Sequence, residues 1–133
     1  MRVLLIIIFV LGACVVLAQK EQCSFYFDTI VKQNVYTSSD SVAVFIGGDM
    51  KYIRYLQDNI KIHNVMEMQS GYRFFLIINE KGETVYVGFR KKPVYETSIP
   101  EQIKELFLYK KLWHPAKCKE KAVVSKFEGV LVF

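Results

Sequence analysis

The stretch that decides the fold is residues 72–112, YRFFLIINEKGETVYVGFRKKPVYETSIPEQIKELFLYKKL. It opens with a short apolar run, Tyr72–Ile78, which is too short for a buried helix and is typical of a strand covered on both faces. Asn79 to Gly82 supplies a turn, in which Gly82 is able to adopt a positive φ. Residues 83–89 are rich in β-branched and aromatic side chains. The sequence therefore predicts a β-hairpin.

A helix is predicted after the hairpin. Ser98 and Glu101 have the spacing of a capping box, and Pro100 stands where a first helical turn tolerates proline. The apolar side chains that follow recur at helical spacing: Ile103, Leu106, Phe107 and Leu112. We expect this apolar stripe to pack on the hairpin.

The N-terminal residues have the pattern of a secretory signal. Arg2 is a short basic region, residues 3–10 are apolar, and residues 16–18 suit cleavage before Gln19. An uncleaved anchor and a lipid-modified Cys14 are the alternatives. The 133-residue chain thus divides into a signal over 1–18, one small domain over 19–116 and a C-terminal extension over 117–133 with a possible edge strand. No transmembrane segment is expected after cleavage.

Two cysteines, Cys23 and Cys118, would remain in the mature chain. In an oxidising compartment they are expected to form one disulfide, which closes a long loop and would stabilise by ~3–5 kcal/mol in the entropic description. Two unpaired thiols are the alternative, because sequence does not place the two residues in space.

The elements before the hairpin are less marked. Residues 24–31 and 42–46 have strand composition, whereas residues 34–41 are polar and fit a loop or a poor helix. Asp49 is placed to cap a helix whose apolar stripe is Met50, Ile53, Leu56 and Ile60. Residues 62–68 read weakly as a strand.

This order of elements is that of a small thioredoxin-like α/β domain, with a mixed sheet, a β-hairpin and a closing helix. Residues 74–88 and 99–107 resemble the last two strands and the last helix of thioredoxins, and are most similar to the endoplasmic-reticulum family of selenoprotein M and selenoprotein F. The segments Val44-Phe-Ile-Gly-Gly-Asp and Leu108-Tyr-Lys-Lys are also similar to that family. The resemblance implies a protein of the secretory pathway that acts in folding or quality control.

The chain departs from the family at its redox motif. Thioredoxin chemistry needs two thiols, or a thiol and a selenol, two residues apart at a helix N-terminus, and this chain has no Cys-x-x-Cys. The motif would fall at residues 31–34 or at residues 47–50, and neither contains sulfur that can act as a nucleophile. A third register places Cys23 at the redox position as a lone thiol, with Tyr26 in place of its partner.

Other patterns are weaker. Basic residues gather at 90–92 and in the tract 110–121, which fits a solvated helix end or an acidic partner, and nucleic acid is not expected for a secreted chain. His63, His114 and Cys118 do not make up a metal site, and no cofactor is expected. A peptide-binding groove or ordinary core packing would account for the methionines and tyrosines at positions 50, 52, 55, 66, 68 and 72.

Three functions follow as hypotheses. The first is a thioredoxin-like module of the endoplasmic-reticulum lumen or the extracellular space that binds a polypeptide partner without disulfide chemistry. The second is a monothiol disulfide oxidoreductase acting through Cys23, and the third is a secreted effector or ligand that uses the fold as a scaffold.

Overall fold

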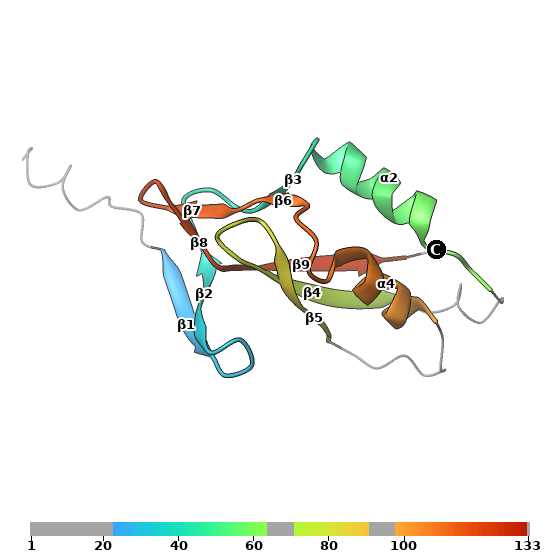
Figure 1. Cartoon of the computed structure of the whole chain (residues 1–133), viewed down its shortest axis with the longest axis horizontal. Helices are drawn as coiled ribbons and strands as arrows, with labels where there is room; N and C mark the ends of the chain where they lie inside the picture. The colour runs from blue at the N-terminus through green and yellow to red at the C-terminus, as the bar shows by residue number, and fades with distance from the viewer. Residues whose placement is uncertain (1–22, 64–70, 91–97, 133) are drawn as a thin grey trace, which may run out of the picture.

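A computed structural model describes residues 23–63, 71–90 and 98–132 of the chain. In these residues it is a mixed α/β structure with a five-stranded mixed sheet and two helices (Figure 1). The sheet has the strand order β1-β2-β9-β4-β5, and its strands are β1 (Ser24–Asp28), β2 (Gln33–Ser38), β9 (Ser125–Leu131), β4 (Tyr72–Ile78) and β5 (Thr84–Phe89). The helices are α2 (Asp49–Asn59) and α4 (Ile99–Phe107).

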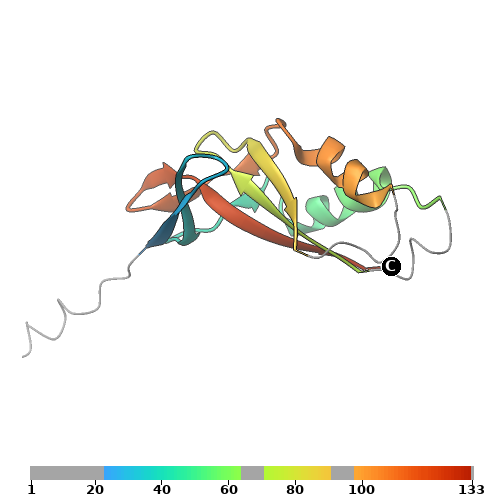
Figure 2. The same cartoon turned by 90° about the horizontal axis from the view of Figure 1, so that it is seen from below.

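Two small ladders complete the structure. The first joins β3 (Val44–Phe45) to β6 (Trp113–His114), and the second is a hairpin of β7 (Ala116–Cys118) and β8 (Lys121–Val123). Figure 2 shows both helices on the same face and at the same end of the sheet, with the β1–β2 hairpin at the opposite end. Residues 1–22 lie outside the described residues, and so does the expected signal.

The hairpin of β4 and β5 is confirmed. Asn79 organises its turn, because its side-chain oxygen accepts hydrogen bonds from the backbone N–H groups of Lys81 at 3.0 Å and Glu83 at 2.9 Å. Gly82 has a φ of 84°, in the left-handed region that glycine adopts without strain.

The helix after the hairpin is also confirmed as α4, but the expected capping box is wrong. Ser98 is the N-cap residue and makes no side-chain hydrogen bond to the helix backbone. Instead, its hydroxyl accepts a hydrogen bond from the Gln102 side chain at 3.0 Å. Gln102 also exchanges two hydrogen bonds with the backbone of Lys61, at 2.7 and 2.8 Å. This glutamine therefore ties the chain that follows α2 to the start of α4.

The segment over residues 34–41 differs from the expected loop or poor helix. Most of it forms β2, which pairs antiparallel with β1 from Asp28↔Gln33 to Ser24↔Ser38. Its threonine, tyrosine and valine favour a strand once a partner is present, and this tertiary pairing outweighs the polar composition. Most of the weak strand expected over 62–68 falls on residues 64–70, which lie outside the described residues.

The C-terminal strand β9 has a more central place than the expected edge. It adds to the outer side of the hairpin, pairing antiparallel with β4 from Tyr72↔Leu131 to Ile78↔Ser125. On its other side it pairs parallel with β2, at Tyr36↔Ser125 alone. The second neighbour of β4 is thus a strand from the C-terminal end of the chain.

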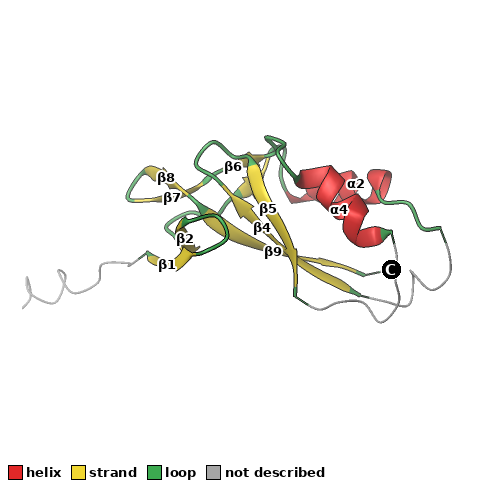
Figure 3. Ribbon diagram, turned by 60° about the horizontal axis from the view of Figure 1, so that its bottom comes forward, coloured by secondary structure: helices red, strands yellow, loops and turns green. Residues whose placement is uncertain are grey.

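The main core lies between the sheet and the helices. Alternate residues of β4 point into it, together with the apolar stripe of α4, and Trp113 and Phe45 close it. Figure 3 shows α2 and α4 on the same side of the sheet. Its fully buried large side chains include Phe74, Phe107 and Trp113. A smaller cluster of Val35, Ile77 and Val124 lies on the opposite face, where β2 meets the sheet.

Candidate functional site

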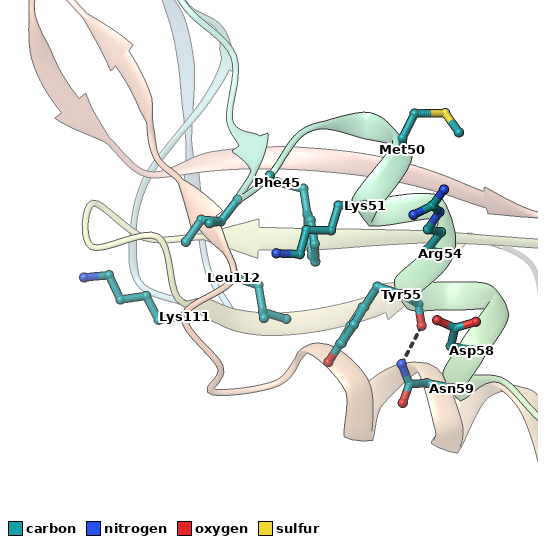
Figure 4. Close-up of a pocket in the computed structure, with 11 residues that line it drawn as sticks. Phe45, Met50, Lys51, Arg54, Tyr55, Asp58, Asn59, Lys111 and Leu112 are labelled. Carbon is teal, nitrogen blue, oxygen red and sulfur yellow. Dashed lines mark hydrogen bonds between the residues drawn. The ribbon is translucent and has the colours of Figure 1, made fainter.

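An open groove runs beside α2, and we call it the α2 groove. Its volume is about 790 Å³, which is within the range of roughly 300–1,000 Å³ that ligand pockets occupy. Figure 4 shows α2 forming one wall and the segment that leads into β6 forming the other. The apolar lining side chains are Phe45, Ile46, Met50, Tyr55 and Leu112.

The base of the α2 groove is held rigidly by aromatic packing. Phe45 is buried and its ring lies 5.4 Å from the rings of both Tyr55 and Trp113. The Tyr55 hydroxyl donates a hydrogen bond to the carbonyl of Leu106, at 2.7 Å, so that α2 is fixed to the last turn of α4. Burial raises the pKa of Tyr55 above its ordinary value, and the side chain stays neutral at physiological pH.

The rim of the α2 groove is mainly cationic. Lys51 and Arg54 project from α2, and Lys111 comes from the opposite wall (Figure 4). All three are exposed, and neither of the two ion pairs found among the described residues involves them. Asp58 is the acidic member of the lining. The groove therefore carries an excess of positive charge over an apolar base.

The face that α2 presents to the core differs from the expected stripe. Leu56 is buried as expected, but Met50 is 66% exposed and Ile53 is 44% exposed. The helix instead packs through Tyr52, Tyr55 and Leu56. Four aromatic rings accommodate the two tyrosine rings: those of Phe45, Phe107, Trp113 and Phe127. The apolar side chains of Met50 and Ile53 are consequently exposed on the surface of α2.

A second feature is the side of β9 that faces away from β4. The N–H of Tyr36 donates to the carbonyl of Val124 at 2.7 Å, which fixes the direction of the backbone groups along the strand. Because these groups alternate between the two sides of a strand, those of Lys126, Glu128 and Val130 point away from β4. Within residues 23–63, 71–90 and 98–132, no strand pairs with this side of β9 beyond Lys126, whose N–H faces the carbonyl of Tyr36 in the parallel pair Tyr36↔Ser125. We call the outward backbone groups of Glu128 and Val130 the β9 edge.

The structure joins Cys23 and Cys118 in a disulfide, the pairing expected from the sequence, with a Cα–Cα distance of 6.2 Å. It connects the residue before β1 to the end of β7. Asp40 lies against it and accepts a hydrogen bond from the N–H of Lys119 at 2.6 Å. Lys119 and Glu120 have φ values of 50° and 66°, the left-handed pair of a tight hairpin turn. The bridge and Asp40 together hold this turn.

The other residues singled out from the sequence are dispersed. His114 lies in β6, and Cys118 is committed to the disulfide. One cluster of possible ligands occurs in the described part of the chain, Cys23, Asp40 and Cys118, and its two sulfurs are bonded to each other. Of the methionines and tyrosines considered for a groove, Met50 and Tyr55 line the α2 groove, whereas Met66 and Met68 lie outside the described residues.

Sequence reasoning missed the cationic rim. Lys51 and Arg54 are an i, i+3 pair on one helix face, a spacing visible in the sequence, but Lys111 joins them only through the β3–β6 pairing. The N–H of Ile46 donates to the carbonyl of Leu112 at 2.9 Å and brings the two walls together. The β9 edge was equally hidden, because its exposure depends on where β2 leaves the sheet.

Neither α2 nor α4, the helices of the described residues, combines the length and the apolar character that crossing a bilayer requires. Comparison of the chain with protein-family models, with curated proteins and with solved structures finds no match.

Proposed function

We propose that the protein is a polypeptide-binding module of the secretory pathway, in which an extended segment of a partner adds to the sheet at the β9 edge. The observation that carries this proposal is the contrast between the two sides of β9. Seven residue pairs join it to β4, whereas one pair joins it to β2. Among the described residues, this side of β9 therefore has no strand partner where β2 diverges from it, and it is the place that we assign to an added strand.

The backbone supplies the binding groups. The N–H and C=O groups of Glu128 and Val130 point into this space, and an incoming extended segment would satisfy them with the hydrogen bonds of a sheet ladder. Backbone pairing of this kind gives affinity with little dependence on the partner's sequence. It suits a module that recognises polypeptides.

Side chains beside the β9 edge supply apolar contacts. Val130 is 58% exposed on one face of β9, and Phe127 and Leu131 are partly buried on the face toward the helices. The ring of Tyr52 on α2 lies 5.5 Å from that of Phe127. Alternate side chains of an added strand would therefore meet α2 on one face and Val130 on the other.

The disulfide supports the location. Disulfides persist in oxidising compartments, so the Cys23–Cys118 bridge fits the endoplasmic-reticulum lumen or the extracellular space. Folding or quality control is the setting that the resemblance to selenoproteins M and F implies. The thioredoxin-like relationship is a separate proposal supported by the unit β4-β5-α4, and polypeptide binding at β9 does not depend on it.

The monothiol alternative requires a free Cys23 thiol, whereas the structure has this sulfur in the disulfide. The scaffold alternative places no demand on the β9 edge. Polypeptide binding is the function for which the sheet offers a specific place.

The proposal is tested by selecting peptides from a phage-displayed random library on the immobilised mature protein. The affinities of the selected peptides are then measured by calorimetric titration. Val130→Pro removes an N–H from the β9 edge but leaves the hydrogen bonds to β4 in place, whereas Val130→Thr retains that N–H and is the matched control. We expect Val130→Pro to weaken binding at least about tenfold and Val130→Thr to leave it nearly unchanged. Equal binding by both variants would overturn the proposal.

A further inference from the structure

We infer that the α2 groove binds a short acidic segment of a partner protein that also carries an apolar side chain. This goes beyond the proposed function, because the α2 groove and the β9 edge are formed by different residues and recognise different features. The β9 edge offers backbone groups, whereas the α2 groove offers charged and apolar side chains.

The charges of the rim select an acidic occupant. Lys51, Arg54 and Lys111 stand on both walls, against a single acidic lining residue, Asp58. No ion pair among the described residues neutralises these three cations. A cleft with one dominant sign of charge above a low-dielectric base concentrates ligands of the opposite sign. Carboxylates of a bound segment would therefore pair with the rim.

The base of the groove requires more than charge from its occupant. The side chains of Ile46 and Met50 are exposed at its border, and the partly buried rings and aliphatic groups of Tyr55 and Leu112 continue inward. An apolar side chain placed there would cover this surface and gain about 25 cal/mol for each Å² of apolar area removed from water. The fitting occupant thus combines carboxylates with an aliphatic or aromatic residue.

This combination favours a peptide over other anions. An anionic polysaccharide or a lipid surface would use an extended basic face, but the cations here surround one hollow of about 790 Å³. Such a volume accommodates a short segment with an inserted side chain. A peptide also presents acidic and apolar groups at fixed spacing, which matches two charged walls on either side of an apolar base.

The test uses two synthetic fluorescein-labelled hexapeptide libraries, scored by fluorescence anisotropy with the mature protein. One library mixes Asp and Glu with Leu and Phe at random positions, and the other replaces the acidic residues by Lys. We expect binding from the acidic library alone. The double variant Lys51→Glu/Arg54→Glu should lose at least about tenfold in affinity. Lys111→Glu should also weaken binding, but by less than the double variant.

Two controls separate the groove from general charge and from the β9 edge. Lys121→Glu, an exposed cation on β8 outside the groove, should leave acidic-peptide binding unchanged, and so should Val130→Pro. Met50→Gln should weaken binding through the apolar contact, without disturbing the fold, because this side chain is largely exposed.

Several results would overturn the inference. The protein would bind neither library, or it would bind both equally well. Alternatively, Lys51→Glu/Arg54→Glu would leave the affinity unchanged, or Lys121→Glu would lower the affinity as much as that double variant does. Vesicles of phosphatidylcholine with phosphatidylserine serve as a second probe. If these vesicles bind in a groove-dependent manner while the acidic library does not, the occupant is a lipid surface and the inference is wrong.

Discussion

The hydroxyl of Tyr55 donates a hydrogen bond to the backbone carbonyl of Leu106, at 2.7 Å, and so joins the middle of α2 to the last turn of α4. The carbonyls in the last turn of a helix have no partner within the helix, so Tyr55 satisfies a group that would otherwise need water. The same side chain forms part of the α2 groove. The position of one groove wall therefore depends on a contact with the core.

Tyr55→Phe removes this bond and keeps the ring that packs on Phe45 and Phe107. We expect the free energy of unfolding to fall by about 0.5–1.5 kcal/mol, the usual net value of one hydrogen bond. Urea denaturation followed by circular dichroism measures the change. Unchanged stability would show that water replaces Tyr55 at the Leu106 carbonyl without loss.

Tyr52→Phe, one helical turn away, should have the opposite effect. The Tyr52 hydroxyl is buried, and no hydrogen-bond partner for it occurs among the described residues. Its ring lies within 6 Å of the rings of Phe45, Trp113 and Phe127. Removal of an unpaired buried hydroxyl should raise the free energy of unfolding by about 1 kcal/mol in the same assay. If Tyr52→Phe lowered the free energy of unfolding as much as Tyr55→Phe does, the Tyr52 hydroxyl would not be an unpaired buried group.

Alkaline pH should destabilise the protein through the same tyrosine. Burial raises the pKa of Tyr52 from 10.0 to about 12, so the folded state holds its proton where the unfolded chain releases it. The free energy of unfolding does not depend on this ionisation below about pH 10 and falls as pH rises from about 10 through 12, with a slope of at most ~1.4 kcal/mol per pH unit for this group. Urea denaturation of wild type and Tyr52→Phe across this range should show the flatter profile for the variant. Identical slopes would exclude Tyr52 as the source.

Loss of the disulfide should destabilise the protein substantially. The bridge closes a loop with a sequence separation of 95, so the double variant Cys23→Ser/Cys118→Ser should lose about 2–5 kcal/mol. Thermal denaturation measures the effect, with dithiothreitol-treated wild type as the comparison. Intact mass and peptide mapping after alkylation establish the thiol state directly. A free, readily alkylated Cys23 in the mature protein would instead support the monothiol mechanism.

The hairpin and the helix after it could be predicted because local chemistry specifies them. The turn from Asn79 to Gly82 needs only the side chain of Asn79 and the positive φ of Gly82. The apolar spacing of α4 indicates which face of that helix is buried. The pairing of Cys23 with Cys118 was foreseeable because no other cysteine would remain after signal cleavage.

Elements that depend on distant partners could not be predicted in the same way. β2 has a polar composition. It forms a strand because it pairs with β1 and, at Tyr36↔Ser125, with β9. The face of α2 was misjudged because the core accepts tyrosines where the sequence offers methionine and isoleucine. The α2 groove depends on the segment that leads into β6, and the β9 edge depends on β9; both segments lie far along the chain from α2 and β2.

Hydrogen exchange at the backbone amides of Glu128 and Val130 tests the central claim most directly. In the free protein these amides point away from β4 and should exchange faster than those of Phe127 and Gly129, which face β4. Addition of a saturating peptide from the library selection should slow exchange at Glu128 and Val130 and leave Phe127 and Gly129 nearly unchanged. Strand addition at β9 would be contradicted if the amides of Glu128 and Val130 exchanged as fast in the peptide-saturated protein as in the free protein.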